Sequence, residues 1–261
     1  MTLGESSTGR PLSSPEWLEA HHQAKLPERT AYATRLAELQ PKSIVDLGCA
    51  TGLWLDLLNS ALPPDCRFIG IDNNEDSLKL ARSRSRTWAR SVVFMNLDIE
   101  KQANLIPPAD LTLAFNIFPY ISDLPAFLEV LSARHPHGAV AVRQYDGAAL
   151  RFGPLSTVFR QRSETELRVA VEGSRQFRHY DLDRVFSALD ASSYENREYG
   201  FELFSRFSPY PDDFLDYFHG TLEWTRTFLS KESAEQLEPW ISERALESSY
   251  FYEVDLVSLL S

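Results

Sequence analysis

The sequence has little cysteine and no long apolar run. Its two cysteines, Cys49 and Cys66, are too few among 261 residues to form a disulfide framework, and such a content is typical of a reducing compartment. No stretch approaches the roughly 18 apolar residues that a membrane-spanning helix needs. Residues 1–14 are rich in Ser, Gly and Pro; they lack the apolar segment of a signal peptide and predict a disordered tail. We therefore expect a cytoplasmic protein with no membrane partner.

Positive charge is also scarce. The 26 Lys and Arg residues against 37 Asp and Glu residues leave a net charge of −11, and a strongly acidic surface repels phosphate backbones. An arginine-rich run at 82–90 is expected to form the solvated face of a helix. The histidines predict no metal site, because the adjacent His21 and His22 face different sides of a helix and His179 lacks a partner at ligand spacing. The composition therefore argues against a nucleic-acid partner and against a bound metal.

What is present is a regular alternation of short apolar strands and helices between residues 43 and 144. The strand segments are continuously apolar, as parallel strands covered on both faces require. The expected strands are 43–47, 66–72, 91–96, 109–116 and 138–144, and the expected helices are 28–39, 53–62, 76–90 and 123–134. The predicted fold class is therefore α/β with an open, doubly wound sheet.

After Tyr145 this alternation ends. Segment 148–180 carries six arginines against three glutamates. The elements expected beyond it are strands at 196–205 and 250–260 and helices at 181–189, 211–229 and 231–246, with Pro239 breaking or kinking the last helix. No domain boundary is visible, so we predict a single domain over 15–261 with capping segments at 148–180 and 206–248.

The sharpest local signal is the turn IVDLGCATG at 44–52, between a predicted strand and a predicted helix. Small residues at such a turn let the backbone approach a ligand, and the N–H groups at the helix start are free. Asp72 ends the second strand, where an acid can reach both hydroxyls of a ribose. Asp98 follows the third strand, where it could meet an adenine amino group. Together these residues predict a nucleotide-type cofactor.

That cofactor could be NAD, whose usual pattern is G-x-G-x-x-G or G-x-G-x-x-A. Counted from Gly48, this chain has Ala50 and Leu53 at the second and third positions. Leu53 would crowd the helix–strand contact that the third small residue provides. The turn therefore fits a dinucleotide poorly, and an NAD-linked oxidoreductase is disfavoured.

The same residues resemble the motifs of the class I, Rossmann-like S-adenosylmethionine-dependent methyltransferases. Residues 46–52 (DLGCATG) are similar to the first motif of that family, D-x-G-x-[GA]-x-G. Residues 71–72 (ID) resemble its second-strand acid and 97–99 (LDI) its adenine-side motif. Residues 109–116 resemble its fourth-strand motif, and 137–139 (HGA) resemble its Pro-Gly-Gly turn with two departures. The motifs occur in the family's order and spacing.

The resemblance covers residues 28–144 and implies a fold, a cofactor and a set of binding residues. It implies a seven-stranded sheet of order 3-2-1-4-5-7-6, with the two late strands as six and seven. The size and irregular cap are similar to those of small-molecule methyltransferases of specialised metabolism, with S-adenosyl-L-methionine as cofactor. The implied cofactor residues are Asp46, Gly48, Ala50 and Gly52 at the methionine, Asp72 and Asn73 at the ribose, Asp98 and Ile99 at the adenine, Asn116 under the sulfonium, and Tyr32 or Arg35 over the methionine carboxylate.

One element bears on the acceptor. Residues 116–120 (NIFPY) are similar to the N-P-P-Y element of methyltransferases that act on amino groups of adenine or glutamine. Here Ile117 and Phe118 separate Asn116 from a single proline, so the tight turn that presents the target amine is not reproduced. Together with the net charge of −11, this argues against methylation of nucleic acid.

Aromatic residues gather late in the chain, with ten Phe, Tyr or Trp residues in segment 199–228. Core packing under a capping helix, or a homodimer contact, would explain part of this cluster. A flat-walled pocket for an aromatic or heterocyclic small molecule would explain the rest. Tyr32 and Trp54 could add to the same wall. We expect segments 148–180 and 199–228 to hold the substrate, with Tyr32 closing over it.

The predicted activity is transfer of a methyl group from S-adenosylmethionine to a small molecule. Positioning supplies much of the rate in such a displacement, so a base is required only when the acceptor must first lose a proton. The candidate catalytic residues near strand ends are Tyr120, Arg143, Tyr145 and His179. None is an evident base, which favours an electron-rich acceptor such as an indole carbon. O- or N-methylation of another metabolite, and cofactor binding without turnover, are the alternatives.

Overall fold

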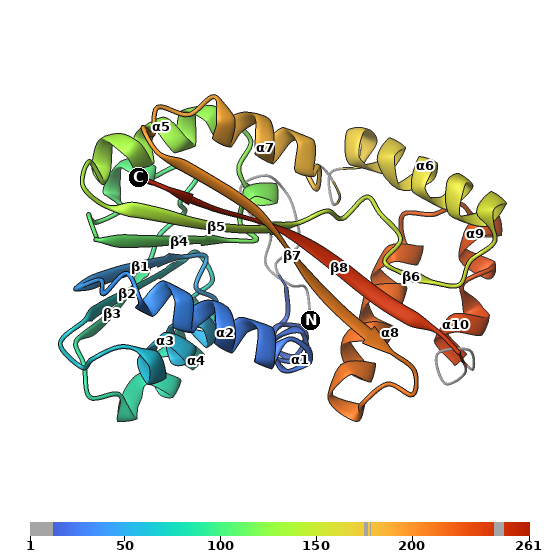
Figure 1. The fold of residues 1–261 in the computed structure, drawn as a ribbon, viewed down its shortest axis with the longest axis horizontal. Helices are drawn as coiled ribbons and strands as arrows, with labels where there is room; N and C mark the ends of the chain where they lie inside the picture. The colour runs from blue at the N-terminus through green and yellow to red at the C-terminus, as the bar shows by residue number, and fades with distance from the viewer. Residues whose placement is uncertain (1–12, 175–176, 178, 243–247) are drawn as a thin grey trace.

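The computed structural model describes residues 13–174, 177, 179–242 and 248–261, arranged as Figure 1 shows. Eight strands form one mixed sheet. The strands are β1 (Ser43–Leu47), β2 (Arg67–Asp72), β3 (Val92–Asn96), β4 (Leu111–Phe115), β5 (Ala139–Tyr145), β6 (Phe152–Gly153), β7 (Arg197–Phe207) and β8 (Tyr250–Leu260). The α/β class and the five predicted core strands are therefore confirmed.

The strand order is β3-β2-β1-β4-β5-β8-β6, and β7 pairs with β8 from its other edge. Strands β1 to β5 are parallel, whereas β8 is antiparallel to β5 and to β7. The sequence predicts that the last strand lies between the fifth strand and the strand that precedes the last one in sequence. This is confirmed, since β8 lies between β5 and β7. The predicted count of seven strands is wrong, because β8 extends past the end of β5 and the short β6 pairs with Tyr250 and Phe251 on that overhang.

The helices cover both faces of the core sheet, and a second group packs against the far end of the antiparallel β7–β8 pair, where β7 keeps Phe201, Leu203 and Phe207 exposed. They are α1 (Pro15–Ala24), α2 (Leu26–Ala37), α3 (Leu53–Ala61), α4 (Glu75–Arg84), α5 (Leu124–Arg134), α6 (Thr157–Gly173), α7 (Leu182–Asp190), α8 (Asp212–Arg226), α9 (Lys231–Glu235) and α10 (Glu238–Ser242). Asp123 caps α5 as predicted, accepting the N–H of Ala126. The helix predicted over 231–246 is divided into α9 and α10, with Pro239 in the first turn of α10; residues 243–247 lie outside the described part.

Two helices were not predicted. α1 begins after Ser14, whose side chain accepts the N–H of Trp17, and has Pro15 at its first position. Ser14, from the predicted tail, thus belongs to a helix cap, while residues 1–12 lie outside the described part. α6 begins after Ser156, whose side chain accepts the N–H of Phe159. Both helices pack against the cap rather than against the core sheet.

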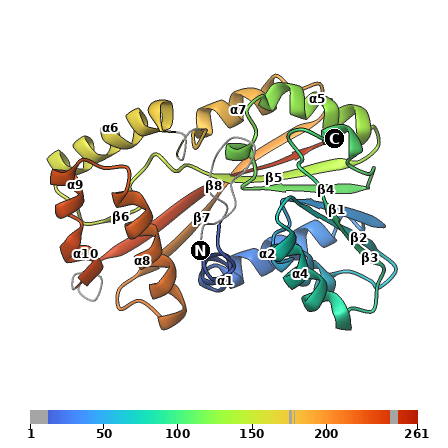
Figure 2. The same cartoon turned by 180° about the vertical axis from the view of Figure 1, so that it is seen from behind.

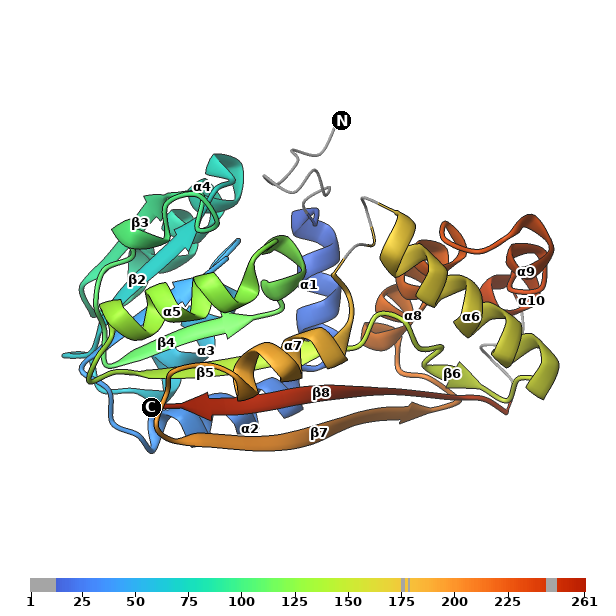
Figure 3. The same cartoon turned by 90° about the horizontal axis from the view of Figure 1, so that it is seen from above.

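Buried apolar side chains form two clusters on the faces of the core sheet and a third under the cap. One core cluster joins α5 and α7 to the sheet, and the other joins α2 and α3 to the opposite face. The third cluster lies between α8 and the antiparallel pair of strands β7 and β8. Figures 1 and 2 show this pair of strands running from the core sheet to the end where α6, α8, α9 and α10 gather. We call that end the cap, and Figure 3 shows α1 between the core sheet and the cap.

Buried charges tie the cap to the core through Glu253 on β8, which is fully buried. Its carboxylate accepts the hydroxyl of Tyr217 on α8 at 2.7 Å. It also forms ion pairs with Lys25, after α1, and with Arg151, after β5. A buried charge is tolerated only when it is paired and hydrogen-bonded, so these three segments must meet at one position of β8.

Candidate active site

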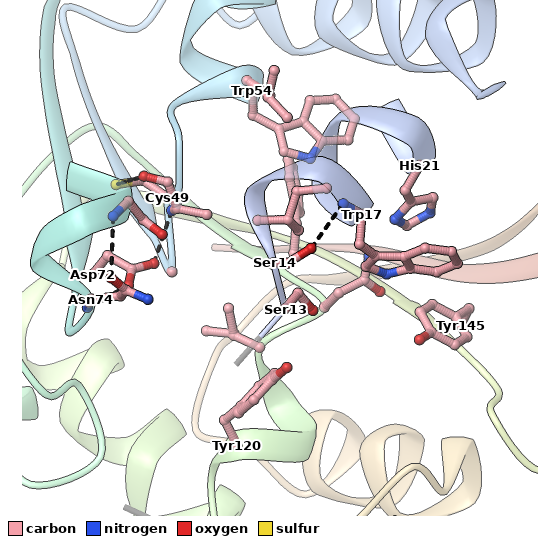
Figure 4. A pocket seen from close by; sticks show the side chains of 18 of the residues that line it. Ser13, Ser14, Trp17, His21, Cys49, Trp54, Asp72, Asn74, Tyr120 and Tyr145 are labelled. Atoms are coloured by element: carbon pink, nitrogen blue, oxygen red, sulfur yellow. Dashed lines mark hydrogen bonds between the residues drawn. The ribbon is translucent and has the colours of Figure 1, made fainter. Parts of the chain in front are cut away.

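A cavity of about 530 Å³ lies at the carboxyl ends of the parallel strands, between the core and the cap. Figure 4 shows Asp72, Asn74 and Cys49 at one end of it and Trp17, His21 and Tyr145 at the other. We call these the Asp72 end and the cap end. The carboxyl edge of a parallel sheet is where ligands bind in this class of fold. Every parallel strand contributes to the lining, through Gly48, Asp72, Leu97, Asn116 and Tyr145.

The predicted glycine turn forms the floor of the Asp72 end. Gly48, Ala50 and Gly52 have φ values of +67°, +45° and +79°, a region that glycine adopts without steric cost. A side chain at Gly48 would place Cβ 2.7 Å from Ile117 Cγ2. Gly48 and Ala50 line the cavity, whereas Gly52 precedes α3 and shapes the turn from below. The small residues therefore keep the backbone open towards a ligand.

Asp72 holds this turn in place. Its Oδ2 accepts the N–H of Ala50 and its Oδ1 accepts the N–H of Asn74, both at 2.8 Å. Burial raises the pKa of the carboxyl, and these N–H donors oppose that rise. Each carboxylate oxygen has a further lone pair, and Asp72 and Asn73 both line the cavity. The carboxylate can therefore accept ligand hydroxyls while it orders the loop.

The predicted adenine-side residues, Asp98 and Ile99, also line the cavity. Asp98 Oδ1 accepts the N–H groups of Glu100 at 3.2 Å and Lys101 at 3.4 Å, so the side chain caps the turn after β3. That turn carries Ile99 and the preceding Leu97 into the wall. Contact of these residues with an adenine stays a prediction. The apolar side chains of Leu97 and Ile99 beside the carboxylate of Asp98 would suit an adenine ring.

Three buried oxygens near the glycine turn have no hydrogen-bond partner among the described residues: Asp46 Oδ2, Thr51 Oγ1 and Asn116 Oδ1. Asp46 is 2% exposed and lies beneath the turn, where burial and the neighbouring Asp72 raise its pKa to about 8. Asn116 follows β4 with φ +56° and lines the cavity. The unpaired oxygen of Asn116, which lines the cavity, fits an ammonium or sulfonium group, whereas the predicted cofactor residue Asp46 does not line the cavity.

The two residues expected from the preceding helix do not line the cavity. Tyr32 packs edge-on against Trp54 and Phe115 inside the core, and burial raises its pKa to about 12. Arg35 is 57% exposed and forms an ion pair with Glu202 on β7. Both side chains point to the sheet face that α2 covers, so neither the predicted carboxylate contact nor the predicted closure by Tyr32 is found. Helix α1 supplies the closing side chains Trp17, Leu18 and His21 instead.

Arg29, near the start of α2, is the basic residue that lines the cavity from this helix. It is 6% exposed, its guanidinium lies 5.2 Å from the Trp54 ring centroid, and it contacts His22 Nδ1 at 3.0 Å. Burial and the nearby Arg143 lower its pKa to about 10. No carboxylate of the described residues lies within ion-pair distance of it, and the charge of Asp255, which is itself paired with Arg143, opposes the fall of its pKa from farther away. A buried guanidinium in this state fits a ligand carboxylate.

The four candidate catalytic residues separate into two pairs. Tyr120 and Tyr145 line the cavity, whereas Arg143 and His179 do not. Arg143 forms ion pairs with Glu202 and Asp255, each at 2.6 Å. His179 has φ +73° in the segment that follows α6. Direct catalytic roles for Arg143 and His179 are therefore not supported by their positions.

The cap end is walled by aromatic side chains from several segments. The aromatic cluster 199–228 divides, since Tyr217, Trp224 and Phe228 line the cavity, Phe204, Phe214 and Phe218 are buried in the cap core, and Phe201 is 67% exposed on β7. Segment 148–180 contributes two side chains, Arg151 and Tyr180. Trp17 and His21 were missed because α1 was not predicted.

Comparison with known proteins agrees with this geometry. A family model described as "Methyltransferase domain" matches residues 40–180. Trans-aconitate 2-methyltransferase of Acidovorax ebreus is 32% identical over 136 residues, which are 50% of this chain and 50% of that protein. The chain thus spans about half the length of the curated relatives that it matches.

Solved structures share the fold across nearly the whole chain. The YcgJ protein from Bacillus subtilis has a TM-score of 0.56 at 12% identity, with 90% of this chain and 98% of that chain covered. The plantazolicin methyltransferase in complex with S-adenosylhomocysteine has a TM-score of 0.50 at 17% identity, with 95% and 91% covered. At such identities the likeness shows the fold alone.

The fold, the cavity and the family model define the class of Rossmann-like, S-adenosylmethionine-dependent methyltransferases. Within it, this chain belongs to the methyltransferase domain family. S-adenosylmethionine is the cofactor, and the cavity has an open backbone turn, the unpaired Asn116 Oδ1 and the buried guanidinium of Arg29 in its lining. Among the described residues, no helix has the length and apolar character that crossing a bilayer requires, and no three His, Cys, Asp or Glu side chains converge as metal ligands.

Proposed function

We propose that the protein transfers the methyl group of S-adenosylmethionine to a small molecule that is held at the cap end. The observation that carries this proposal is the single cavity joining the motif residues at the Asp72 end to the aromatic walls at the cap end. When bound, the cofactor supplies an electrophilic methyl carbon on sulfur. The protein aligns the acceptor with that carbon and excludes water.

At the Asp72 end the proposed contacts follow from charge. Asp72 accepts hydroxyls of the ribose, and Asp98 with Ile99 flanks the adenine. Asn116 faces the cationic groups, whose positive charge favours the ionised form of Asp46 beneath the turn. Arg29 takes the methionine carboxylate in the role that the sequence assigned to Tyr32 or Arg35.

At the cap end, aromatic walls favour a flat acceptor, an aromatic or heterocyclic ring. We propose that residues 15–261 act as one domain in which segments 148–180 and 206–248 hold this acceptor, with α1 closing over it. The name of the trans-aconitate methyltransferase relative specifies a small-molecule acceptor, which supports a small molecule here. The specialised-metabolism subtype and a homodimer are proposals of the sequence alone.

The acceptor atom is the open part of the proposal. An indole carbon was favoured because the sequence shows no evident base. That premise fails, since the unpredicted helix α1 brings the imidazole of His21 to the cap end. We therefore favour an oxygen or nitrogen atom over a carbon atom as the acceptor of the methyl group.

The experiment has two stages. Calorimetry with S-adenosylhomocysteine and with NAD should show micromolar binding of the first ligand and none of the second. Methyl-labelled S-adenosylmethionine is then incubated with a panel of aromatic hydroxyl and ring-nitrogen compounds, with a matched panel of aliphatic acids, and label in the organic product is counted. Binding without transfer to any compound would support the alternative of a non-catalytic binding protein, and NAD binding alone would overturn the assignment.

A further inference from the structure

His21 occupies a defined place at the cap end. Its ring stacks on Tyr217 of α8 with centroids 4.8 Å apart and planes at 7°, and on Trp17 of its own helix at 6.3 Å and 27°. The residue is 8% exposed and lines the cavity. Figure 4 shows the imidazole beside Trp17 and on the same side of the cavity as Tyr145. Tyr217 covers one face of the imidazole, and Trp17, whose ring centroid lies 5.4 Å from that of Tyr217, packs on the same side of it.

The imidazole carries an unpaired polar atom. His21 Nε2 is buried and has no hydrogen-bond partner in the part of the chain that the structure describes. The charged groups that act on the ring come from every element around it: Lys25 after α1, Arg29 from α2, Arg143 from β5 and Arg151 after β5. Burial and these cations lower the pKa of His21 well below 6.5. The imidazole is therefore neutral at physiological pH, and its Nε2 is an acceptor in the tautomer that carries the proton on Nδ1.

We propose that His21 is the base of the acceptor subsite, and that its Nε2 accepts a hydrogen bond from an O–H or N–H on the acceptor ring and takes that proton during methyl transfer. This inference rests on the proposed function and names its acceptor class. The lone pair of the acceptor oxygen or nitrogen forms the new bond to the methyl carbon. The carbon–sulfur bond breaks with its electron pair on sulfur, and the proton passes to His21 and then to water.

A weakly basic imidazole is suited to this task. An O–H or N–H becomes strongly acidic once its heavy atom bonds to the methyl carbon, so the base needs little affinity for the proton before that point. The surrounding arginines and Lys25 then favour release of the proton from the imidazolium, which restores the neutral ring. A ring C–H cannot make the preceding hydrogen bond. The position of the His21 imidazole and the positive charges around it therefore favour acceptors that carry an O–H or a ring N–H, such as phenols and azoles.

The test compares two probes that differ in one hydrogen-bond donor. The protein is saturated with S-adenosylhomocysteine, and the binding of 2-naphthol and of its methyl ether, 2-methoxynaphthalene, is measured by calorimetry. Wild-type protein should bind 2-naphthol at least about tenfold more tightly, because a site built to pair with a donor rejects the analogue that lacks it. H21F keeps an aromatic ring in contact with Trp17 and Tyr217, and should abolish the preference. H21Q keeps an acceptor, and should retain part of it.

The outcomes are distinguishable. Unchanged affinity for S-adenosylhomocysteine in each variant shows that the fold and the cofactor site are intact. A preference for 2-naphthol that survives in H21F, or no preference in wild type, overturns the role of His21. If neither naphthalene binds while S-adenosylhomocysteine does, the aromatic acceptor class and this inference fail together, and the methyltransferase proposal stands. If 2-naphthol is methylated, H21Q should reduce kcat at least about tenfold with a smaller effect on KM, the mark of a lost proton acceptor.

Discussion

The carboxylate of Asp72, at the end of β2, accepts the backbone N–H of Ala50, in the turn after β1, at 2.8 Å. Ala50 has φ +45°, a conformation that non-glycine residues seldom adopt. The hydrogen bond therefore holds a strained residue at the floor of the cofactor site. The residue that we propose to bind the ribose is thus also the residue that shapes the glycine turn.

We expect D72A to weaken binding of S-adenosylhomocysteine at least about tenfold and to lower the free energy of unfolding by about 1–3 kcal/mol, because two buried N–H groups lose their acceptor. The sequence alone suggests that folding is unaffected by this change. Calorimetry and urea unfolding measure the two effects. D65A, at an exposed acid paired with Lys42, is the control and should change neither. Affinity within twofold of wild type in a folded D72A protein would exclude the ribose role.

Arg29 and Arg35 offer a matched comparison on one helix. R29Q should raise the Kd for S-adenosylhomocysteine roughly tenfold or more, because a buried charge-assisted contact to a carboxylate is lost. R35Q should leave the Kd unchanged, since Arg35 is exposed and paired with Glu202. A raised Kd in R35Q together with an unchanged Kd in R29Q would support the contact of Arg35 with the cofactor that the sequence predicts, and would exclude Arg29 from the cofactor site.

The raised pKa of Asp46 predicts a pH dependence of stability. In the unfolded chain the carboxyl titrates near its usual value of 3.8, and in the ligand-free fold near 8. Between these values the folded state binds the extra proton, so this group's contribution to stability falls as pH rises from about 4 to about 8. D46N is permanently neutral and should lose that dependence. The free energy of unfolding is measured by urea unfolding for D46N and for wild type at pH 5 and at pH 8. Raising the pH should make D46N more stable relative to wild type by at least about 1.4 kcal/mol, which is the value of one pKa unit.

At the cap end, W224A should raise KM for an aromatic acceptor roughly tenfold while the Kd for S-adenosylhomocysteine stays within about twofold, because the side chain lines only this end of the cavity. F201A removes an aromatic residue that is 67% exposed on β7, and should leave both constants unchanged. Acceptor kinetics that respond to F201A and not to W224A would mark the cluster as an assembly surface rather than a substrate wall.

The sequence predicted the core and the motif residues because their signals are local. A buried strand, a glycine turn and a strand-end acid lie within a few residues of one another, so Gly48, Asp72 and Asn116 could be placed at one sheet edge. Helix α1 also had a local signal, Ser14 followed by Pro15 and Glu16, which are N-cap and first-turn residues.

The residues that complete the site had no such signal. Arg29 lies one turn before Tyr32 on the same side of α2, and at that position along the helix it lines the cavity, whereas Tyr32 and Arg35 do not. The role of His21 depends on Tyr217, which is remote in sequence and packs on its ring. Both are products of tertiary packing, which periodicity within one helix cannot specify.

Glu253 has a consequence for how the chain selects its strand register. In a strand, a slip of one residue moves every side chain to the opposite face. Such a slip of β8 would turn Glu253 away from Lys25, Arg151 and Tyr217 and would present Tyr252 or Val254 to those cations. An uncompensated buried charge is strongly unfavourable, so a one-residue slip of β8 is penalised on the cap side. Because β8 pairs with β5 along one edge and β7 along the other, Glu253 contributes to the alignment of the cofactor half with the acceptor half.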